Sequence, residues 1–356
     1  MPHRSSRFRV LARLASLLVV AVAAGGGCDP SAPLLATGPQ PGDSTGAPVD
    51  SVPTTPPPDT TVPPTPEPPP DTTPPDTIPN PPGTPPTHVG LAFGHAQQPA
   101  TTWGMDIGAT VYTAQPESLL ARLESARRLN LRLYVSLSGS VPYLRDANGF
   151  SLTLWKQRVD RFRGLDLQPY IDDGTIAGHF LLDEADDKSN WNGKIVPVEL
   201  VEQMAAYSKA IWPTMPAIIR ASTAYLGTYH GTYDQLDGVR VQYHARFGDL
   251  DQFISTNVRQ AKELGLIVVG GLNVLRGGGE ESGLLNPSSA DDKRPKYYMN
   301  ASQLKTWGRR FLSEPGLCGF ILWEYDSAYL ARPDINAAIE QLEQQARGLP
   351  NRSCRK

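Results

Sequence analysis

In Gly178-His179-Phe180-Leu181-Leu182-Asp183-Glu184, an apolar run begins at a glycine and ends in two carboxylic acids. The same pattern returns in Gly319-Phe320-Ile321-Leu322-Trp323-Glu324-Tyr325-Asp326. A strand that is apolar on both faces is typical of a parallel sheet covered by helices. Barrel enzymes built on such sheets carry their reacting groups at the carboxyl ends of the strands. The two stretches therefore predict a parallel α/β fold with acids at the ends of two strands.

Strand-like and helix-like segments alternate from residue 88 to residue 349, which is a usual length for one (β/α)8 TIM barrel. Seven strands are clear, and 109–112 supplies the eighth if the helix that precedes it is shortened or lost. An open, doubly wound sheet is the competing architecture, but no glycine-rich turn follows the first strand. The predicted strands are 89–93, 109–112, 131–137, 176–182, 217–221, 239–243, 266–272 and 318–323, and the predicted helices are 116–129, 152–162, 196–211, 250–264, 301–312 and 334–346.

The chain before residue 88 has a different character. Residues 1–27 carry arginines, then an apolar run and three glycines, as a bacterial export signal does. The small residues before Cys28 resemble the lipobox of bacterial lipoproteins, which implies that this cysteine is lipidated and becomes the mature N-terminus. Residues 28–87 are rich in Pro, Thr and Asp, a composition that favours an extended, disordered linker. We therefore expect an exported chain, lipid-anchored to the bacterial membrane or cell surface, or secreted if cleavage occurs nearby.

The other two cysteines are Cys318, at the start of the last predicted strand, and Cys354, in the tail 350–356. The last helix should return the chain to the end of the barrel where that strand begins. An oxidising compartment permits a disulfide, so we predict a Cys318–Cys354 bond. A formal net charge of −3 with interspersed signs gives no basic surface for nucleic acid, and we expect a monomer without a cofactor.

Glu184 and Glu324 are the candidate catalytic pair. Hydrolysis of a glycosidic bond uses one carboxylic acid to protonate the leaving oxygen, and usually a second carboxylate to attack the anomeric carbon or activate water. Two carboxylates about 5 Å apart repel by roughly 3 kcal/mol at an effective dielectric constant near 20, which favours keeping one of them protonated. Asp326, two residues after Glu324, is an alternative acid.

The segments 176–184 and 319–325 resemble the TIM-barrel glycoside hydrolase superfamily. The resemblance implies that Glu184 is the acid/base residue and that Trp323 stacks on a sugar ring. Retaining members of its largest clan have Asn where this chain has Asp183, and a nucleophile at the end of strand seven, where this chain has Asn273. The adjacent Asp and Glu resemble instead the hexosaminidases that use the 2-acetamido group of the substrate as nucleophile. Asp183 would then orient that group, provided that a bend lets both acids reach the site.

Several other residues follow predicted strands and are candidates for contacts with a carbohydrate substrate. Each also has a structural interpretation, because Asp183 and Glu184 could form an ion pair with Arg220, and a tyrosine or histidine could simply be packed. Asp186 and Asp187, with Asp183, could bind Ca²⁺ or Mg²⁺, although solvated loop charges are the simpler interpretation. The substrate-binding candidates are His95, Trp103, Arg220, Tyr243, His244, Asn273 and Trp323.

Three functions remain open from sequence. The first is a membrane-tethered glycoside hydrolase that acts on a polysaccharide or cell-envelope glycan. The second is a non-catalytic glycan-binding barrel lipoprotein, which stays open because no acid follows the seventh strand. The third, a metal-dependent hydrolase, is disfavoured by few and scattered histidines. Carboxyl groups of the two glutamates within about 10 Å across an open cleft would favour the enzyme, and burial of either in a salt bridge would favour the binding protein.

Overall fold

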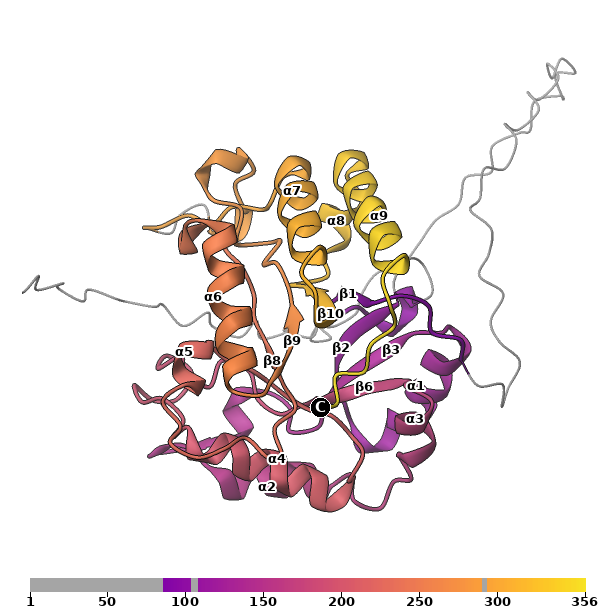
Figure 1. Ribbon diagram of the computed structural model, residues 1–356, viewed down its shortest axis with the longest axis vertical. Helices are drawn as coiled ribbons and strands as arrows, with labels where there is room; N and C mark the ends of the chain where they lie inside the picture. The colour runs from indigo at the N-terminus through magenta and orange to yellow at the C-terminus, as the bar shows by residue number, and fades with distance from the viewer. Residues whose placement is uncertain (1–85, 104–107, 290–292) are drawn as a thin grey trace, which may run out of the picture. The chain divides into compact units, whose positions relative to one another are not determined.

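A computed structural model describes residues 86–103, 108–289 and 293–356 of the chain (Figure 1). Eight parallel strands close into a barrel in the order β1, β10, β9, β8, β7, β6, β3, β2. This confirms the predicted closed barrel and excludes the open sheet. The barrel strands are β1 (Ala92–His95), β2 (Ala109–Thr113), β3 (Arg132–Ser136), β6 (Ile176–Phe180), β7 (Ala217–Arg220), β8 (Gly238–Arg240), β9 (Ile267–Gly270) and β10 (Leu317–Leu322), and β4 (Arg145–Asp146) and β5 (Gly149–Phe150) form a separate small hairpin.

The six predicted helices are confirmed and surround the ring of strands (Figure 1). Between β1 and β2 the described residues hold only the 3-10 turn η1 (Ala100–Thr102), in agreement with a shortened first helix. The short helices α3 (Gln168–Asp172), α5 (Thr223–Leu226) and α8 (Ser327–Leu330) were not predicted, because one turn has no periodicity to detect. The long helices are α1 (Pro116–Arg128), α2 (Leu152–Asp160), α4 (Glu199–Ile211), α6 (Leu250–Glu263), α7 (Ala301–Leu312) and α9 (Pro333–Arg347).

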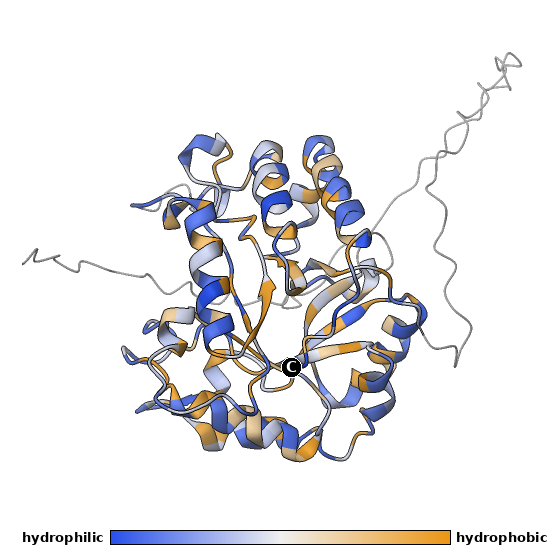
Figure 2. Ribbon diagram, in the orientation of Figure 1, coloured by the Kyte–Doolittle hydropathy of each residue, from blue (hydrophilic) through white to orange (hydrophobic). Residues whose placement is uncertain are grey.

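The strands bury side chains on both faces, as their apolar composition predicts. The outward faces pack beneath the helices in one large hydrophobic cluster. The inward faces form a second, smaller cluster inside the barrel. Figure 2 colours the strands mainly on the hydrophobic side of the scale and the surrounding helices with a mixture of both sides. The inner cluster includes Ala92, Tyr134, Phe180, Ile218, Val269 and Ile321.

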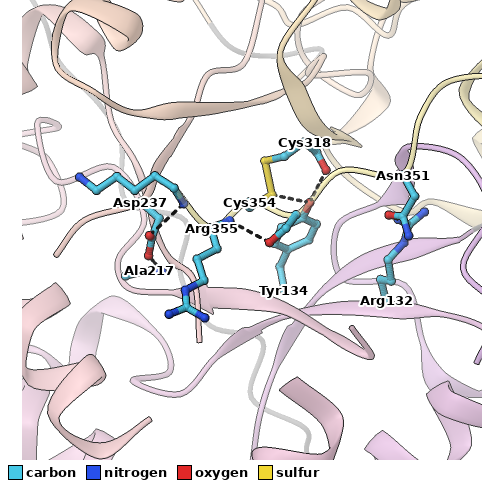
Figure 3. The surroundings of a disulfide bond; sticks show 10 residues. Arg132, Tyr134, Ala217, Asp237, Cys318, Asn351, Cys354 and Arg355 are labelled. Carbon is cyan, nitrogen blue, oxygen red and sulfur yellow. Dashed lines mark hydrogen bonds between the residues drawn. A yellow bond between two sulfur atoms is a disulfide. The ribbon is translucent and has the colours of Figure 1, made fainter. Parts of the chain in front are cut away.

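The C-terminal segment covers the N-terminal end of the barrel. Cys354 forms a disulfide with Cys318 at the start of β10, with their Cα atoms 5.1 Å apart, so the structure pairs the two cysteines for which the sequence predicts a bond (Figure 3). The Tyr134 hydroxyl lies 3.4 Å from the Cys354 sulfur, and Arg132 donates a hydrogen bond of 2.8 Å to Asn351. A cavity of about 400 Å³ at this end is lined by these residues. This is the end where the strands begin, whereas barrel enzymes carry their reacting groups at the opposite end.

The predicted export signal, Cys28 and the linker lie outside the described residues, except for Pro86 and Thr87. Among the described residues, none of the helices has the length and apolar content that crossing a membrane requires.

Replacing both Cys318 and Cys354 with serine is expected to lower the free energy of unfolding by about 2–4 kcal/mol. The bond joins residues 36 positions apart, and its loss increases the conformational entropy of the unfolded chain. Urea unfolding of the variant and of the oxidised wild type measures the difference. Wild type in reductant should behave like the variant, and equal midpoints in all three samples would contradict the prediction.

His179 should make the stability of the protein depend on pH. It lies fully buried beneath the helices, 2.8 Å from the Ser208 hydroxyl and stacked on Trp155, and burial lowers its pKa to about 3. As the pH falls below about 6.5, His179 becomes protonated in the unfolded chain but stays neutral in the folded protein. The free energy of unfolding therefore decreases until the pH reaches the pKa of His179 in the folded protein.

In a His179→Asn variant, the slope of unfolding free energy against pH between pH 6 and pH 4 should decrease by up to about 1.4 kcal/mol per pH unit. Urea unfolding at each pH gives the slope. The same substitution at the exposed His230 is the control and should leave the slope unchanged. Equal slopes in the wild type and the His179 variant would refute this role of His179.

Candidate active site

The acids that follow β6 and β10 lie at the carboxyl end of the barrel. The two strands are four positions apart in the closed ring of eight, so their ends face each other across the mouth. Trp323, at the end of β10, has its ring centroid 5.9 Å from the guanidinium carbon of Arg220 at the end of β7. Arg220 in turn contacts both acids that follow β6. Side chains from the two sequence stretches with the repeated pattern therefore meet at one mouth.

Asp183 and Glu184 share one cation. The Nη1 atom of Arg220 lies 2.9 Å from Asp183 Oδ1 and 2.8 Å from Glu184 Oε1. Burial alone would lower the pKa of Arg220, but the charges of the two acids outweigh it and raise that pKa. The Arg220 side chain is 13% exposed, whereas both acids are 38% exposed. The ion pair of Asp183 and Glu184 with Arg220 is therefore present, and both carboxylates remain partly exposed.

A bend at Glu184 brings the two acids together. Glu184 has a φ of +49°, a left-handed conformation that is uncommon for a residue with a Cβ atom. Its carbonyl oxygen accepts hydrogen bonds from the buried Trp191 Nε1 at 2.9 Å and from the Asp187 amide at 3.1 Å. Asn190 donates to its carboxylate at 3.3 Å. In a straight strand, neighbouring side chains would point to opposite faces, so the bend is what lets both carboxylates reach one guanidinium.

Glu324 has a different environment. Its side chain is half-buried, and this burial raises its pKa, with the charge of Arg276 acting in the opposite direction and that of Asp326 adding to the increase. A raised carboxyl pKa suits a proton donor near neutral pH. Asp326, the alternative acid, accepts a hydrogen bond from the Tyr329 amide as the N-cap of α8. That contact gives Asp326 a structural role at the start of α8.

A cavity of about 540 Å³ opens beside Glu184 and Arg220. Its volume is within the range of small-molecule sites in proteins. Arg240, Gln242 and His244 line one wall, since alternate residues along β8 and its continuation share the inner face. Sequence reasoning missed Arg240 and Gln242. The available signal was the alternation of polar and apolar residues within the predicted strand 239–243, where a strand buried on both faces would be apolar throughout.

Two of the predicted substrate-binding residues, Tyr243 and Trp103, lie in the hydrophobic core. Tyr243 is 3% exposed and packs against Phe253 and Trp307 beneath the helices. Its neighbours on either side face the mouth, so strand alternation turns Tyr243 outward. Trp103 is also buried, with its ring edge against Tyr112. Their position after a strand predicts that both residues face the mouth, whereas the structure packs both side chains in the hydrophobic core.

The remaining predicted polar residues are buried near the strand ends. Burial lowers the pKa of His95 to about 4, and its Nδ1 atom has no hydrogen-bond partner among the described residues. Burial, followed by the charge of Arg246, lowers the pKa of His244 to about 3, so its imidazole is neutral at pH 7. Asn273, after β9, accepts a hydrogen bond of 2.9 Å from the Arg276 amide. The residue at this strand end, where the retaining enzymes carry their nucleophile, is thus an amide and not an acid.

The carboxylates considered for a cation have separate partners. Asp183 contacts Arg220, Asp186 accepts from the Ser222 amide at 3.0 Å, and Asp187 accepts from Ser189. Across the part of the chain that the structure describes, no three His, Cys, Asp or Glu side chains gather as a metal site would require.

No protein-family model matches the chain, and no curated protein is similar to it in sequence. Among solved structures, a GH18 chitinase from Pseudoalteromonas aurantia is 12% identical, with a TM-score of 0.43 over 70% of this chain and 99% of that one. An endo-1,4-beta-xylanase from Caldicellulosiruptor owensensis is 13% identical, with a TM-score of 0.43 over 68% and 89%. A GH10 xylanase from termite gut, which contains a bacterial Ig-like domain, is 11% identical, with a TM-score of 0.48 over 73% and 75%. These likenesses are distant and concern the fold alone.

The bend at Glu184 predicts an unusual order of stability between two variants. Glu184→Gly should be more stable than Glu184→Ala by about 0.5–1 kcal/mol, because glycine adopts a positive φ without steric cost. Both variants lose the ion pair with Arg220, so the comparison isolates the backbone. Urea unfolding measures the difference, and an alanine variant that is the more stable would show that the left-handed conformation is not retained.

Proposed function

We propose that this chain is a glycoside hydrolase that cleaves a polysaccharide or cell-envelope glycan by carboxylate acid/base catalysis. One observation carries the proposal: acids from opposite strand ends border one mouth, and their electrostatic environments differ. Glu184 is ion-paired with Arg220, whereas burial raises the pKa of Glu324. Environments that separate two carboxyl groups in this way divide them into a charged partner and a proton donor.

The two environments favour a division of roles that differs from the one implied by resemblance. Glu324 is the better proton donor to the leaving oxygen, because burial favours its protonated form. Glu184, held against Arg220, is the carboxylate that attacks the anomeric carbon or activates water. Trp323, from the same strand end as Glu324, offers an aromatic face to the sugar ring.

A variant of the proposal uses the adjacent acids after β6. Contact of Asp183 and Glu184 with the same Arg220 nitrogen supports it, since the bend that this mechanism needs is present. Asp183 would orient the 2-acetamido group of the substrate while Glu184 donates the proton. Cleavage of N-acetylated sugars alone would favour this variant over the Glu184 and Glu324 pair.

A non-catalytic glycan-binding barrel is the second candidate. The salt bridge with Arg220 favours it, because it engages both acids after β6, and Asn273 leaves the end of β9 without an acid. In this case Trp323 and the polar residues of the mouth would bind a glycan without cleaving it.

We also propose that the chain is exported and held at a bacterial membrane by lipid on Cys28. The composition of residues 28–87 supports this, because a proline-rich spacer would let the barrel reach a bulky, immobile glycan. Secretion without the lipid remains the alternative.

The test compares Glu184→Gln and Glu324→Gln in the full chain on polysaccharides and chromogenic glycosides. Each substitution removes one carboxyl group while keeping its shape, and should lower kcat by about a hundredfold or more. Glu263→Gln, on the exposed face of α6, is the matched control and should leave kcat unchanged. Full activity in both active-site variants would sink the assignment, and glycan binding without cleavage by the wild type would support the second candidate.

The pH dependence tests the assignment of roles. A proton donor works only while protonated, so kcat/KM of the wild type should fall as pH rises through the raised pKa of Glu324. Glu324→Gln should lose this alkaline fall in its residual activity. Loss of the same limb in Glu184→Gln, and not in Glu324→Gln, would return the proton donor role to Glu184.

A further inference from the structure

Arg240 is enclosed in the barrel and has no ion-pair partner among the described residues. It is 1% exposed, and its Nη2 atom lies 3.4 Å from both Gln242 Oε1 and the Ile321 carbonyl oxygen. Its Nε and Nη1 atoms, which carry three of the five guanidinium N–H groups, have no hydrogen-bond partner within the described residues. The rings of Phe180 and Trp323 lie 5.8 and 5.9 Å from the guanidinium carbon, and such contacts replace only part of the lost hydration.

The neighbouring strand adds a second positive charge. Arg220 and Arg240 are paired in the register of β7 and β8, so both point to the inner face. Burial, followed by the charge of Arg220, lowers the pKa of Arg240 to about 9, which still leaves it cationic at neutral pH. Asp183 and Glu184 make their ion pairs with Arg220. The charges of Asp183 and Glu184 act on Arg240 as well, but within residues 86–103, 108–289 and 293–356 no acid forms an ion pair with it.

Arg240 and Gln242 form a donor row along the wall of the 540 Å³ cavity, with His244 above them. The Nε2 atom of Gln242 is another buried donor without a partner in the described part of the chain. The positive charges of Arg246 and Lys296 also act on His244. Buried polar groups are normally hydrogen-bonded, so two adjacent unpartnered donors in one cavity wall indicate a ligand that accepts hydrogen bonds.

We propose that this cavity binds an acidic sugar, whose carboxylate or sulfate oxygens accept hydrogen bonds from Arg240 and Gln242. The proposal rests on the proposed function, because it names the substrate class of the same site. A guanidinium presents paired N–H groups that fit two oxygens of a carboxylate or sulfate. A neutral sugar hydroxyl could accept a hydrogen bond, but it would leave the charge uncompensated.

A purely structural role for Arg240 predicts a different result for substitution of this residue. An apolar side chain of similar length would fill the same space without burying a charge, and such replacements are often neutral or stabilising. If Arg240 only fills space, Arg240→Met should keep both stability and ligand preference. If it binds an anion, the variant should keep its stability and lose its preference for acidic sugars.

The experiment measures binding of D-glucuronate, D-galacturonate, D-glucose 6-sulfate and D-glucose to the full chain by titration calorimetry. The wild type should bind at least one acidic sugar more tightly than glucose, and the preferred one identifies carboxylate or sulfate as the anion. Arg240→Met should weaken that binding by on the order of ten- to a hundredfold and leave glucose binding unchanged. Arg240→Lys, which keeps the charge without the paired N–H groups, should lie between them.

Arg259→Met, on the exposed face of α6, is the control for loss of a positive charge and should bind like the wild type. Thermal unfolding of each variant checks that it is folded. Equal binding of glucose and acidic sugars to the wild type, or an unchanged acidic preference in Arg240→Met, would overturn the proposal. The binding measurement does not depend on turnover, so it is independent of the proposed hydrolase activity. Binding of acidic sugars by a chain that cleaves no glycoside would refute only the hydrolase. Cleavage of neutral glycosides without a preference for acidic sugars would refute only this inference.

Discussion

The contact of one guanidinium with two adjacent carboxylates organises the mouth of this barrel. Arg220 draws Asp183 and Glu184 to a single nitrogen atom, and the left-handed backbone at Glu184 makes that contact possible. Trp191 stabilises this conformation, because its fully buried side chain donates a hydrogen bond to the Glu184 carbonyl oxygen. An uncommon backbone conformation persists where surrounding contacts stabilise it, and such positions cluster at functional sites.

The charges at this mouth are unevenly matched. Arg220 is ion-paired, whereas Arg240 has no ion-pair partner in the described part of the chain, and the two residues stand side by side on neighbouring strands. Glu324, across the ring, is half-buried and has a raised pKa. Burial strengthens each of these interactions, because water no longer screens them. A ligand that brings an anionic group to Arg240 and a glycosidic oxygen to Glu324 would satisfy both at once.

The two ends of the barrel differ in the side chains that they gather. At the end where the strands begin, the disulfide joins the tail to β10, and Tyr134 packs against it (Figure 3). At the other end, Glu184, Asp186, Asp187 and three arginines line a cavity, and the Trp323 ring lies 5.9 Å from the guanidinium carbon of Arg220. Strand ends in parallel barrels are free to differ in this way, because the strands themselves carry the fold and the residues after them do not.

The sequence by itself favoured the barrel over an open sheet and identified seven of its strands, a candidate eighth at 109–112 and the long helices, because apolar periodicity is local and survives without tertiary contacts. It also placed Glu184 and Glu324 at strand ends. Only the tertiary structure decided which way side chains point at those ends. Tyr243 faces the core although its neighbours face the mouth, and Arg240 lies in the cavity wall although it reads as one polar residue within a strand. The physical reason is that a one-residue change in register or a single bend reverses the face a side chain occupies, and packing across strands fixes both.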